Sequence, residues 1–491
     1  MTDQPTRRDT ANSLHDLEPP GANEMFAIEA HGIDYIPESH RTGKPSDLFW
    51  IWLGAQTNVF PVIFGALLVS FGLSFWAAFS AIVVANLFWP LVGVIGASGP
   101  RAGTATFVIS RTAFGRRGNL APAVLNWLTV MGWEAAGIII ATLSLVSLAD
   151  FMGLGHSGAV KAGCLVVTMI VVYGVGIWGH ATIAFLQTWS SRILLVLAVV
   201  IAVPVFKDAH LAAPSSTTVS AWTVGLTLML AGVPFSWLNF PAEYHRYLPS
   251  DTSIAKQVWW TTAGGFIPGV FMSVLGAAAG TASREVLDDP VSGIQHMLPG
   301  ALVVPFLIVV VLGMIANDVF STYSSGLGLQ ILGVRLPRHK AVVIDAVVAG
   351  AVAVWAVFFH DFYDLLTTYL ALMIVWIAPW AGVFIVNLIE RRNRYPIRAM
   401  YEDASGGAEH AHRGWSYWAL ASWLIGGGIG SLFVDSSVYV GPLARQLGGA
   451  DLSGLVGIVA GAALYAASRL AARHRGTVPT TRDGAFDAER A

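Results

Sequence analysis

Apolar segments about 20 residues long recur along almost the whole chain, and they constrain its fold more than any other feature. A helix needs roughly 20 predominantly apolar residues to cross the hydrocarbon core of a bilayer. Twelve such segments are present, at about 48–73, 75–97, 120–149, 161–179, 182–206, 222–247, 258–281, 300–326, 339–360, 363–390, 415–434 and 453–471. Charged residues make up 12% of the chain, about half the fraction found in soluble proteins. The sequence therefore predicts an all-α integral membrane protein with 12 transmembrane helices.

The distribution of basic residues predicts which side of the membrane each loop faces. If the N-terminus is cytoplasmic, 24 of the 28 Lys and Arg residues fall on the cytoplasmic side, and the exceptions are Lys161, Lys207, Arg284 and Arg445. The positive-inside rule expects such a bias, and one missed helix would have reversed every later loop. We therefore predict a multi-pass protein with both termini cytoplasmic. The lack of a targeting segment and the 12-span form suggest a bacterial inner membrane.

Several other classes of protein receive no support from the sequence. The single cysteine, Cys164, excludes an intramolecular disulfide and a cysteine-based metal site. The net charge of −2, with no basic patch containing interleaved aromatic residues, gives no indication of a nucleic-acid partner. There is no metal-ligand cluster, no nucleophile motif with a base and no phosphate-binding glycine loop, so an enzyme is not expected. A repeated selectivity filter, typical of channels, is also lacking. A transporter is the leading hypothesis, and a sensor or structural protein is the alternative.

Two of the predicted spans contain residues that interrupt helices. The first reads "WIWLGAQTNVFPVIFGALL" and carries Gly54, Gln56, Thr57, Asn58 and Pro61 near its middle. The sixth reads "LMLAGVPFSWLNFPAEYHRYLP" and carries Gly232, Pro234, Ser236, Asn239 and Pro241. Proline removes a backbone donor and clashes with the preceding turn, and non-helical backbone at this depth is tolerated only in protein or beside a cavity. Two proline kinks without a function are the alternative interpretation.

The positions of the interruptions indicate an internal repeat. Spans one and six are five apart, so the chain divides into two five-helix halves, and the second is inverted because five is odd. Discontinuous helices at matching positions of inverted halves point to a transporter binding site. The predicted units are a cytoplasmic tail (1–46), a first repeat (47–206), a second repeat (207–390), a cytoplasmic loop with two extra helices (391–471) and a cytoplasmic C-terminal tail (472–491).

Several long motifs resemble the nucleobase:cation symporter-1 family, the cytosine, purine, uracil, thiamine, allantoin and hydantoin permeases. They are "ESHRTGKPSDLFWIWLGAQTN" (38–58), "GPRAGTATFVISRTAFGRRGN" (99–119), "GWE" (132–134), "SWLNFPAEYHRYLP" (236–249) and "YSSGL" (323–327). The resemblance runs from about residue 36 to 400 and is strongest to the purine/cytosine permease branch. It implies a leucine-transporter-type fold with a 5+5 inverted repeat, and alternating access. It also implies import of a flat, neutral nitrogen heterocycle with Na⁺ or H⁺ as coupling ion and no other cofactor.

The chain departs from the family pattern in two places. The sixth-span motif is usually Asp-Tyr-Ser-Arg-Tyr, whereas this chain has Glu243-Tyr244-His245-Arg246-Tyr247. Four residues after the tryptophan of the third span the family often has a polar amide, and here Gly137 stands. Since that amide is expected to recognise the edge of the substrate, the cargo stays open. A vitamin-like heterocycle, such as a thiamine precursor or pyridoxine, is the alternative to a nucleobase.

A planar heterocycle is held by stacking on its faces and by hydrogen bonds at its edges. The resemblance implies that Trp133 on the third span and Trp237 at the break of the sixth sandwich the ring, beside Ser236. The alternative is that both tryptophans are packing residues, like most of the 18 in the chain. Gln56 and Asn317 are further candidates, because an amide offers both a donor and an acceptor. Each of them could instead satisfy exposed backbone groups.

Glu134 lies about halfway through the third span, beside Trp133. A charge at the centre of a bilayer costs roughly 2.5–3.5 kcal/mol on insertion scales, so such residues usually face a cavity or a partner. Glu134 could bind a ring NH of the substrate or serve as the proton-coupling group. The alternative is a structural hydrogen bond to a neighbouring helix. We expect it to border the cavity and rank substrate binding ahead of proton coupling.

The resemblance also implies a sodium site between the first and eighth spans. Na⁺ prefers oxygen ligands, and an unwound helix frees carbonyls to supply them. The sequence "NDVFST" offers Asp318, Ser321 and Thr322, and the segment from Gly54 to Asn58 would provide the opposing carbonyls. Buried Ser and Thr hydroxyls that bond back to their own helix are the alternative.

Glu243 and Arg246 are three residues apart near the inner end of the sixth span. The favoured interpretation is an ion pair that anchors the helix at the interface, and a cytoplasmic gate is the alternative.

The expected partners of the protein are a small heterocyclic substrate and membrane lipids, with the chain acting as a monomer.

Overall fold

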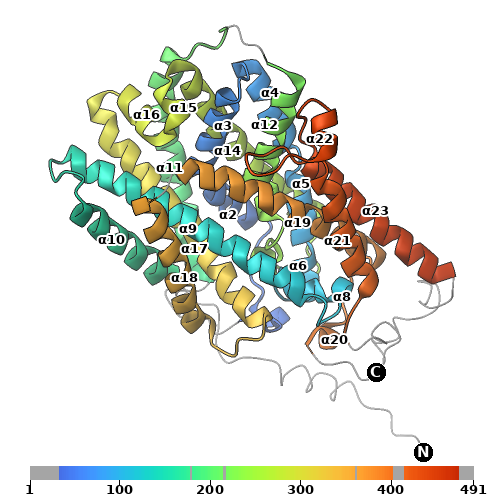
Figure 1. Cartoon of the computed structure of the whole chain (residues 1–491). Helices are drawn as coiled ribbons and strands as arrows, with labels where there is room; N and C mark the ends of the chain where they lie inside the picture. Colours follow the sequence, from blue (N-terminus) through green and yellow to red (C-terminus); the bar gives the residue numbers. More distant parts are fainter. Residues whose placement is uncertain (1–31, 177–179, 214–216, 360–361, 402–413, 475–491) are drawn as a thin grey trace, which may run out of the picture.

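The computed structural model describes residues 32–176, 180–213, 217–359, 362–401 and 414–474. These residues form an all-helical protein (Figure 1). Its elements are η1 (Glu38–His40), α2 (Asp47–Gln56), α3 (Val59–Ser70), α4 (Phe75–Asn86), α5 (Trp89–Gly96), α6 (Ser98–Ala102), α7 (Thr106–Ile109), α8 (Arg111–Phe114), α9 (Leu120–Phe151), α10 (Gly158–Gly176), α11 (His180–Asp208), α12 (Val219–Gly232), η2 (Phe235–Trp237), α13 (Ala242–His245), α14 (Ile254–Ala282), α15 (Glu285–Asp288), α16 (Pro290–Met297), α17 (Gly300–Ile331), α18 (Arg338–Phe359), α19 (Phe362–Glu390), α20 (Ile397–Tyr401), α21 (Tyr417–Ser431), α22 (Pro442–Gln446) and α23 (Ser453–His474).

The predicted membrane spans correspond to long apolar helices. Among the described residues, ten helices are long and apolar enough to cross a membrane, and the bent pair α2–α3 makes an eleventh. The helix α21 has 15 residues and falls short of that length, so the twelfth span stays a prediction. The pairing of two inverted five-helix halves also stays a prediction.

The first and sixth spans are interrupted where the sequence predicts it. The helices α2 and α3 meet at a bend of 52°. Asn58 adopts an extended conformation there, and its side chain accepts a hydrogen bond from the backbone N–H of Phe60 (2.8 Å), which caps α3. The sixth span ends its first helix at Gly232, continues as the short 3-10 turn η2 and resumes as α13. Both predicted discontinuities are therefore confirmed.

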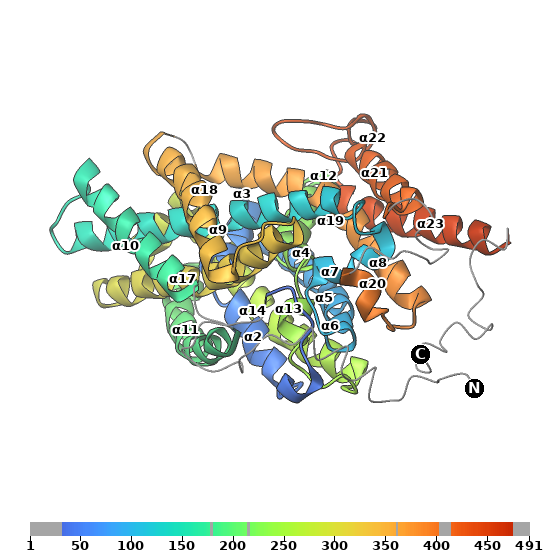
Figure 2. The ribbon, with the colours of Figure 1, turned by 90° about the horizontal axis from the view of Figure 1, so that it is seen from below.

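The long helices gather into three groups around these two breaks. The pair α9 and α17 pack along each other, with α10 and α18 against both (Figures 1 and 2). The helices α2, α3 and α5 pack on α14, and α4 contacts both α12 and α14. The C-terminal helices α21 and α23 pack on α19 (Figure 1). The binding site described below lies where the broken segments meet α9 and α17.

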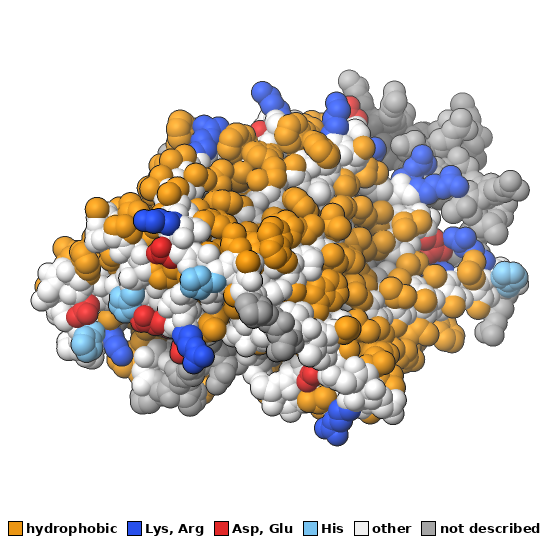
Figure 3. All heavy atoms as spheres, turned by 90° about the horizontal axis from the view of Figure 1, so that it is seen from above, with side chains coloured by type: hydrophobic (Ala, Val, Ile, Leu, Met, Phe, Trp, Pro, Cys, Tyr) orange, Lys and Arg blue, Asp and Glu red, His pale blue; other side chains and the backbone are white. Residues whose placement is uncertain are grey.

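The outer surface of the helices is apolar over a wide area. Figure 3 shows hydrophobic side chains covering most of one face, with charged side chains towards its margins. Large hydrophobic residues are more than half exposed on several spans, among them Val203, Val347 and Leu372. Lipid chains cover such a surface without an energetic penalty, as expected of a membrane protein.

The end of the predicted N-terminal tail is packed against the protein rather than extending from it. Residues 1–31 lie outside the described part, but Ile36 and Arg41 are buried. The Ile36 N–H donates to Gly103 O (2.8 Å), and the Arg41 guanidinium donates to the carbonyls of Ile36 and Pro100. The polar composition of this segment gave no indication of these contacts, because they are made by its backbone and by one buried arginine. The predicted C-terminal tail lies outside the described residues from 475 onwards.

We expect the orientation of the protein to be measurable by cysteine labelling. In a Cys164→Ala background, Ser437→Cys tests the loop between α21 and α22, which the positive-inside rule places outside. Thr42→Cys tests the segment before α2, which the rule places in the cytoplasm. A membrane-impermeant maleimide should label Ser437→Cys on intact cells and Thr42→Cys only after permeabilisation. The opposite pattern would reverse the predicted orientation.

Close contact between α3 and α14 should make one glycine indispensable. A Cβ atom at Gly276 would overlap the backbone carbonyl of Val62, which cannot move independently of its helix. Because overpacking typically costs about 1–3 kcal/mol, Gly276→Ala should lower the midpoint of thermal unfolding in detergent. The matched control is Gly163→Ala on α10, where a Cβ atom meets nothing within 4 Å. An equal effect of the two substitutions would contradict this explanation.

Candidate binding site

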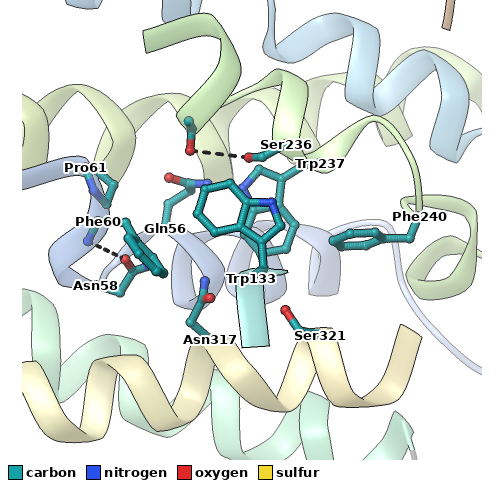
Figure 4. A pocket seen from close by; sticks show the side chains of 11 residues that line it. Gln56, Asn58, Phe60, Pro61, Trp133, Ser236, Trp237, Phe240, Asn317 and Ser321 are labelled. Carbon is teal, nitrogen blue, oxygen red and sulfur yellow. Dashed lines mark hydrogen bonds between the residues drawn. The ribbon is translucent and has the colours of Figure 1, made fainter. Parts of the chain in front are cut away.

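The breaks in the first and sixth spans line one small cavity together with α9 and α17 (Figure 4). The lining residues are Gln56, Asn58, Phe60 and Pro61 of the first break, Gly232, Ser236, Trp237 and Phe240 of the sixth, Trp133 of α9, and Asn317 and Ser321 of α17. The cavity has a volume of about 20 Å³, room for one or two water molecules. A ring can enter only if the lining side chains move apart.

Two amides organise the broken backbone of the first span. The Nδ2 atoms of Asn58 and Asn317 both donate to the carbonyl oxygen of Ala55, at 2.6 and 3.2 Å. The carbonyl is freed by the break, and in a dry interior it needs such partners. Asn317 therefore joins α17 to the break and still lines the cavity. The Oε1 atom of Gln56 is buried and has no partner among the described residues, so it is available as an acceptor.

The two predicted stacking residues line this cavity together. Trp133 is held edge-to-face by Phe60 and Tyr369, with ring centroids 5.1 and 5.5 Å apart. Its Nε1–H has no partner among the described residues. Trp237 is held in the same way by Trp52, Phe240 and Phe320, at 5.4 to 5.7 Å. Such edge-to-face contacts between aromatic rings are favourable and hold both tryptophans in place beside the cavity.

The remaining polar liners are hydroxyls. Ser236 Oγ lies 2.8 Å from the carbonyl oxygen of Val233 and 3.3 Å from that of Gly232, so it is bonded to its own segment (Figure 4). Ser321 faces the cavity one turn after Asn317 on α17. The polar side-chain groups that line the cavity are all uncharged: amides, hydroxyls and the indole N–H groups of the two tryptophans. The site therefore suits a neutral ring with donors and acceptors at its edge.

The structure differs from the expectation for Glu134. The side chain is fully buried, but it is not among the residues that line the cavity. It faces α10, where the hydroxyl of Tyr173 donates to its Oε2 atom (3.1 Å). The physical reason is helical geometry, because consecutive residues of a helix point about 100° apart. Trp133 faces the cavity, and Glu134 lies behind it.

The residues expected at the sodium site have different side-chain neighbours. Ser321 faces the cavity, but Asp318 lies against Gly137 of α9 and Thr322 against Gly176 of α10. Gly54 of the opposing helix lies against the side chain of Gln187 on α11. The Nε2 atom of Gln187 donates to the carbonyl oxygen of Ala316 on α17 (2.6 Å).

At this contact between α2, α11 and α17, side-chain amides therefore donate hydrogen bonds to backbone carbonyl oxygens. The Ala55 carbonyl binds the amides of Asn58 and Asn317, and the Ala316 carbonyl binds that of Gln187. The predicted sodium site at Gly54, Asn58, Asp318, Ser321 and Thr322 stays a prediction. The hydroxyl of Thr322 is buried without a partner among the described residues.

Glu243 and Arg246 are buried and bind other elements rather than lying at an exposed interface. Glu243 Oε2 accepts a hydrogen bond from Ser324 Oγ (2.5 Å). Arg246 donates to the hydroxyl of Tyr323 (2.7 Å) and to the carbonyl oxygen of Gly32 (2.8 Å). The sixth span is therefore tied to α17 and to the N-terminal segment at this end of the molecule.

Some residues that lie in or near the site were not predicted from the sequence. Phe60 and Phe240 line the cavity, and both flank the predicted breaks, so their position in those segments could have identified them. Asp345 is a carboxylate within the ninth apolar segment, the same signal that drew attention to Glu134. Relatives often have a polar amide where this chain has Gly137. In the structure the carboxyl group of Asp318 occupies the space beside Gly137.

Comparison with known proteins identifies the family. The family model described as permease for cytosine/purines, uracil, thiamine and allantoin matches residues 35–457. The chain belongs to this family. Among related permeases, YxlA of Bacillus subtilis, named provisionally as a purine-cytosine permease, is 25% identical over 89% of this chain and 95% of its own. The purine-cytosine permease fcyB of Emericella nidulans is 24% identical over 89% of this chain and 87% of its own.

Solved structures of transporters share the fold of this permease. Mhp1, a nucleobase-cation-symport-1 family transporter in a closed conformation with bromovinylhydantoin bound, matches with a TM-score of 0.74. The match covers 92% of this chain and 98% of Mhp1 at 18% identity. The predicted family and the predicted multi-pass membrane character are therefore confirmed. Since the family consists of permeases, the prediction of a transporter rather than an enzyme is confirmed as well.

Proposed function

We propose that this permease is a secondary active transporter that imports a nucleobase or a related planar nitrogen heterocycle by cation symport. The observation that carries the proposal is the cavity in which two broken helices bring Trp133 and Trp237 beside uncharged amide and hydroxyl groups. Aromatic faces suit a flat ring, and amides complement the alternating donors and acceptors of its edge. A charged ligand would lack a counter-ion among the residues that line the cavity.

Larger cavities on both sides of the site support alternating access. One of about 640 Å³ is lined by residues of α3, α12 and α19, and it includes Leu228 and Ala231, close to the cavity-lining Gly232. Another, of about 240 Å³, is lined by residues of α2 and α11 and by the segment around α13, including Ile51 and Tyr244. Movement of the broken segments could open the central cavity to either one, as expected of a carrier with a midplane site.

We further propose a bacterial inner-membrane location, 12 spans with both termini in the cytoplasm, and a monomeric carrier. The bias of 24 of 28 basic residues towards one side supports the orientation. A vitamin-like heterocycle such as a thiamine precursor or pyridoxine is the alternative cargo, because the family description includes thiamine.

A ligand panel should identify the cargo. We would purify the full chain in detergent and measure its thermal unfolding with cytosine, adenine, uracil, allantoin, hydantoin, thiamine and pyridoxine. A ligand that binds only the folded state stabilises it by about 2.7 kcal/mol at a hundredfold excess over Kd. We expect one class of heterocycle to raise the unfolding midpoint, and the same compound to exchange in a counterflow assay with proteoliposomes. If no panel member does either, the proposed function is wrong.

Substitution of the stacking residues should weaken binding selectively. Trp133→Ala and Trp237→Ala each remove a ring face, and the loss of about 1.5 kcal/mol corresponds to roughly tenfold weaker binding. Trp133→Phe should retain part of the affinity. The matched control is Trp259→Ala on α14, whose side chain is 65% exposed. Equal weakening by the control and the cavity variants, measured by titration of the identified heterocycle, would contradict the stacking role.

A further inference from the structure

Three carboxyl groups lie buried behind the binding cavity, in the middle of the apolar helices. They belong to Glu134 on α9, Asp318 on α17 and Asp345 on α18, and each side chain is 0% exposed. The elements that hold them are packed against one another, with α10 completing the group. None of the three lines the cavity. The binding of a neutral ring therefore does not account for them.

The hydrogen bonds of the three carboxyl groups are unequal. Asp345 is well bonded, because its Oδ1 accepts from Trp127 Nε1 (3.1 Å) and its Oδ2 from Ser325 Oγ (2.9 Å). Glu134 accepts one bond, from the hydroxyl of Tyr173, which also lies 3.3 Å from the backbone carbonyl oxygen of Asp345. The other oxygen of Glu134 has no partner among the described residues.

Asp318 is the most poorly bonded of the three. Both of its carboxyl oxygens are buried without a partner among the described residues, and so is the hydroxyl of Thr322 one turn later. A buried acceptor without a donor is costly, and an ionised one in a membrane interior is costlier still. Both carboxyl oxygens of Asp318 and one of Glu134 thus accept no hydrogen bond from the described residues. A bound proton would neutralise such a buried carboxylate.

The surrounding helices offer no described cation to balance these groups. On α10 the basic residue is Lys161, which is half-buried near the start of the helix, and on α18 it is Lys340, which is exposed near the start of the helix. On α11, Arg192 lies over the ring of Trp50, 4.3 Å from its centroid. On α16, His296 binds Glu285. The side chains of Arg338, His339 and Asp364 lie outside the described residues.

The neutral and like-charged neighbours complete this environment. On α10 and α19 the facing titratable groups are Tyr173, bonded to Glu134, and Tyr369, whose hydroxyl donates to the carbonyl of Thr129. On α17, Tyr323 accepts from Arg246. Three carboxylates without a facing cation repel one another, and neutralising at least one by a proton relieves that repulsion.

The three carboxyl groups form a series at different depths in the membrane rather than a cluster around one point. No three His, Cys, Asp or Glu side chains of the described residues are placed to hold a metal ion. Asp345 lies seven residues into α18, about 10 Å along its axis, whereas Glu134 lies fourteen residues into α9, about 21 Å. Asp318 lies thirteen residues before the end of α17, about 20 Å. The series therefore leads from mid-membrane towards the end predicted to be cytoplasmic.

Two helices, α9 and α17, carry residues of both the cavity and the carboxyl series. Trp133 lines the cavity and the next residue, Glu134, belongs to the series. Asn317 and Asp318 stand in the same relation on α17. A shift of α9 or α17 as the cavity closes on a ring would therefore change the surroundings of both carboxyl groups. Such a shared element is what energetic coupling between two sites requires.

We propose that Glu134, Asp318 and Asp345 form the proton-binding site of this carrier. The ligand is H⁺, held by Glu134 and Asp318 at mid-membrane and released past Tyr173 to Asp345. One proton enters from outside with the neutral substrate and leaves on the cytoplasmic side, so the carboxyl groups return to their starting state. This inference rests on the proposed function and names the coupling ion of that carrier.

The test separates driving ion from cargo. Full-length protein in proteoliposomes is given each heterocycle of the panel above, with the membrane potential clamped to zero. For the cargo that shows counterflow, we expect a ΔpH of 2, acid outside, to drive accumulation without Na⁺. The limit for one proton is about 100-fold, because each pH unit contributes a factor of ten. An inward Na⁺ gradient at equal pH should drive none.

Variants assign the proton to these residues. Glu134→Gln and Asp345→Asn should keep counterflow within about twofold of the wild type and reduce proton-driven accumulation to simple equilibration. The matched control is Asp150→Asn, an exposed carboxyl group on α9, which should accumulate like the wild type. Stabilisation by the cargo in thermal unfolding checks that each variant is folded. If Glu134→Gln does not fold, Asp345→Asn with an assay of substrate-induced proton uptake decides.

The outcomes distinguish the two proposals. Accumulation driven by Na⁺ alone, or proton-driven accumulation retained in both variants, overturns the proton site while leaving the transport function intact. A wild-type protein that shows no counterflow with any panel member overturns the transport function, and this inference with it. Loss of accumulation in Asp150→Asn as well would show a general effect of removing a carboxyl group, and would also overturn the assignment.

Discussion

Backbone groups released by the two broken spans must find hydrogen-bond partners in a region that lipid keeps dry, and the centre of the structure depends on this requirement. The Ala55 carbonyl obtains its partners from Asn58, next to it in the chain, and from Asn317 on α17. The second of these bonds joins two segments 262 positions apart. The same contact places a polar edge beside Trp133 and Trp237. The hydrogen bond that satisfies the broken backbone therefore also helps to form the site.

A second constraint acts behind the cavity, where carboxyl groups are buried. The arrangement separates two kinds of polar group, with uncharged amides and hydroxyls facing the cavity and carboxyls facing the neighbouring helices. A flat neutral ring can then be bound without competing for the carboxyl groups. A cavity residue and a carboxyl group are neighbours on α9 (Trp133 and Glu134) and on α17 (Asn317 and Asp318), so movement of either helix affects both. The proposed coupling of ring transport to a proton rests on this division.

The features that depend on periodicity and local composition could be predicted from the sequence. The apolar segments predicted the spans, and Gly54, Pro61, Gly232 and Pro234 predicted where two helices break, because these effects are local to the backbone. The placement of Trp133, Trp237, Gln56, Ser236 and Asn317 around one cavity also agrees with the residues chosen from the sequence. Asp345 carried the same signal as Glu134, a carboxyl group within an apolar segment, but its partners Tyr173 and Trp127 come from other helices.

The sequence by itself determined that this protein is a helical membrane carrier of a recognisable family, with two interrupted spans and a carboxylate beside a tryptophan. Only the tertiary structure decided which way each polar side chain faces. Neighbours such as Trp133 and Glu134, or Asn317 and Asp318, point about 100° apart, so proximity in the sequence does not place them in the same site. The direction depends on how α9 and α17 are rotated against α10 and α18, and packing between distant segments sets that rotation.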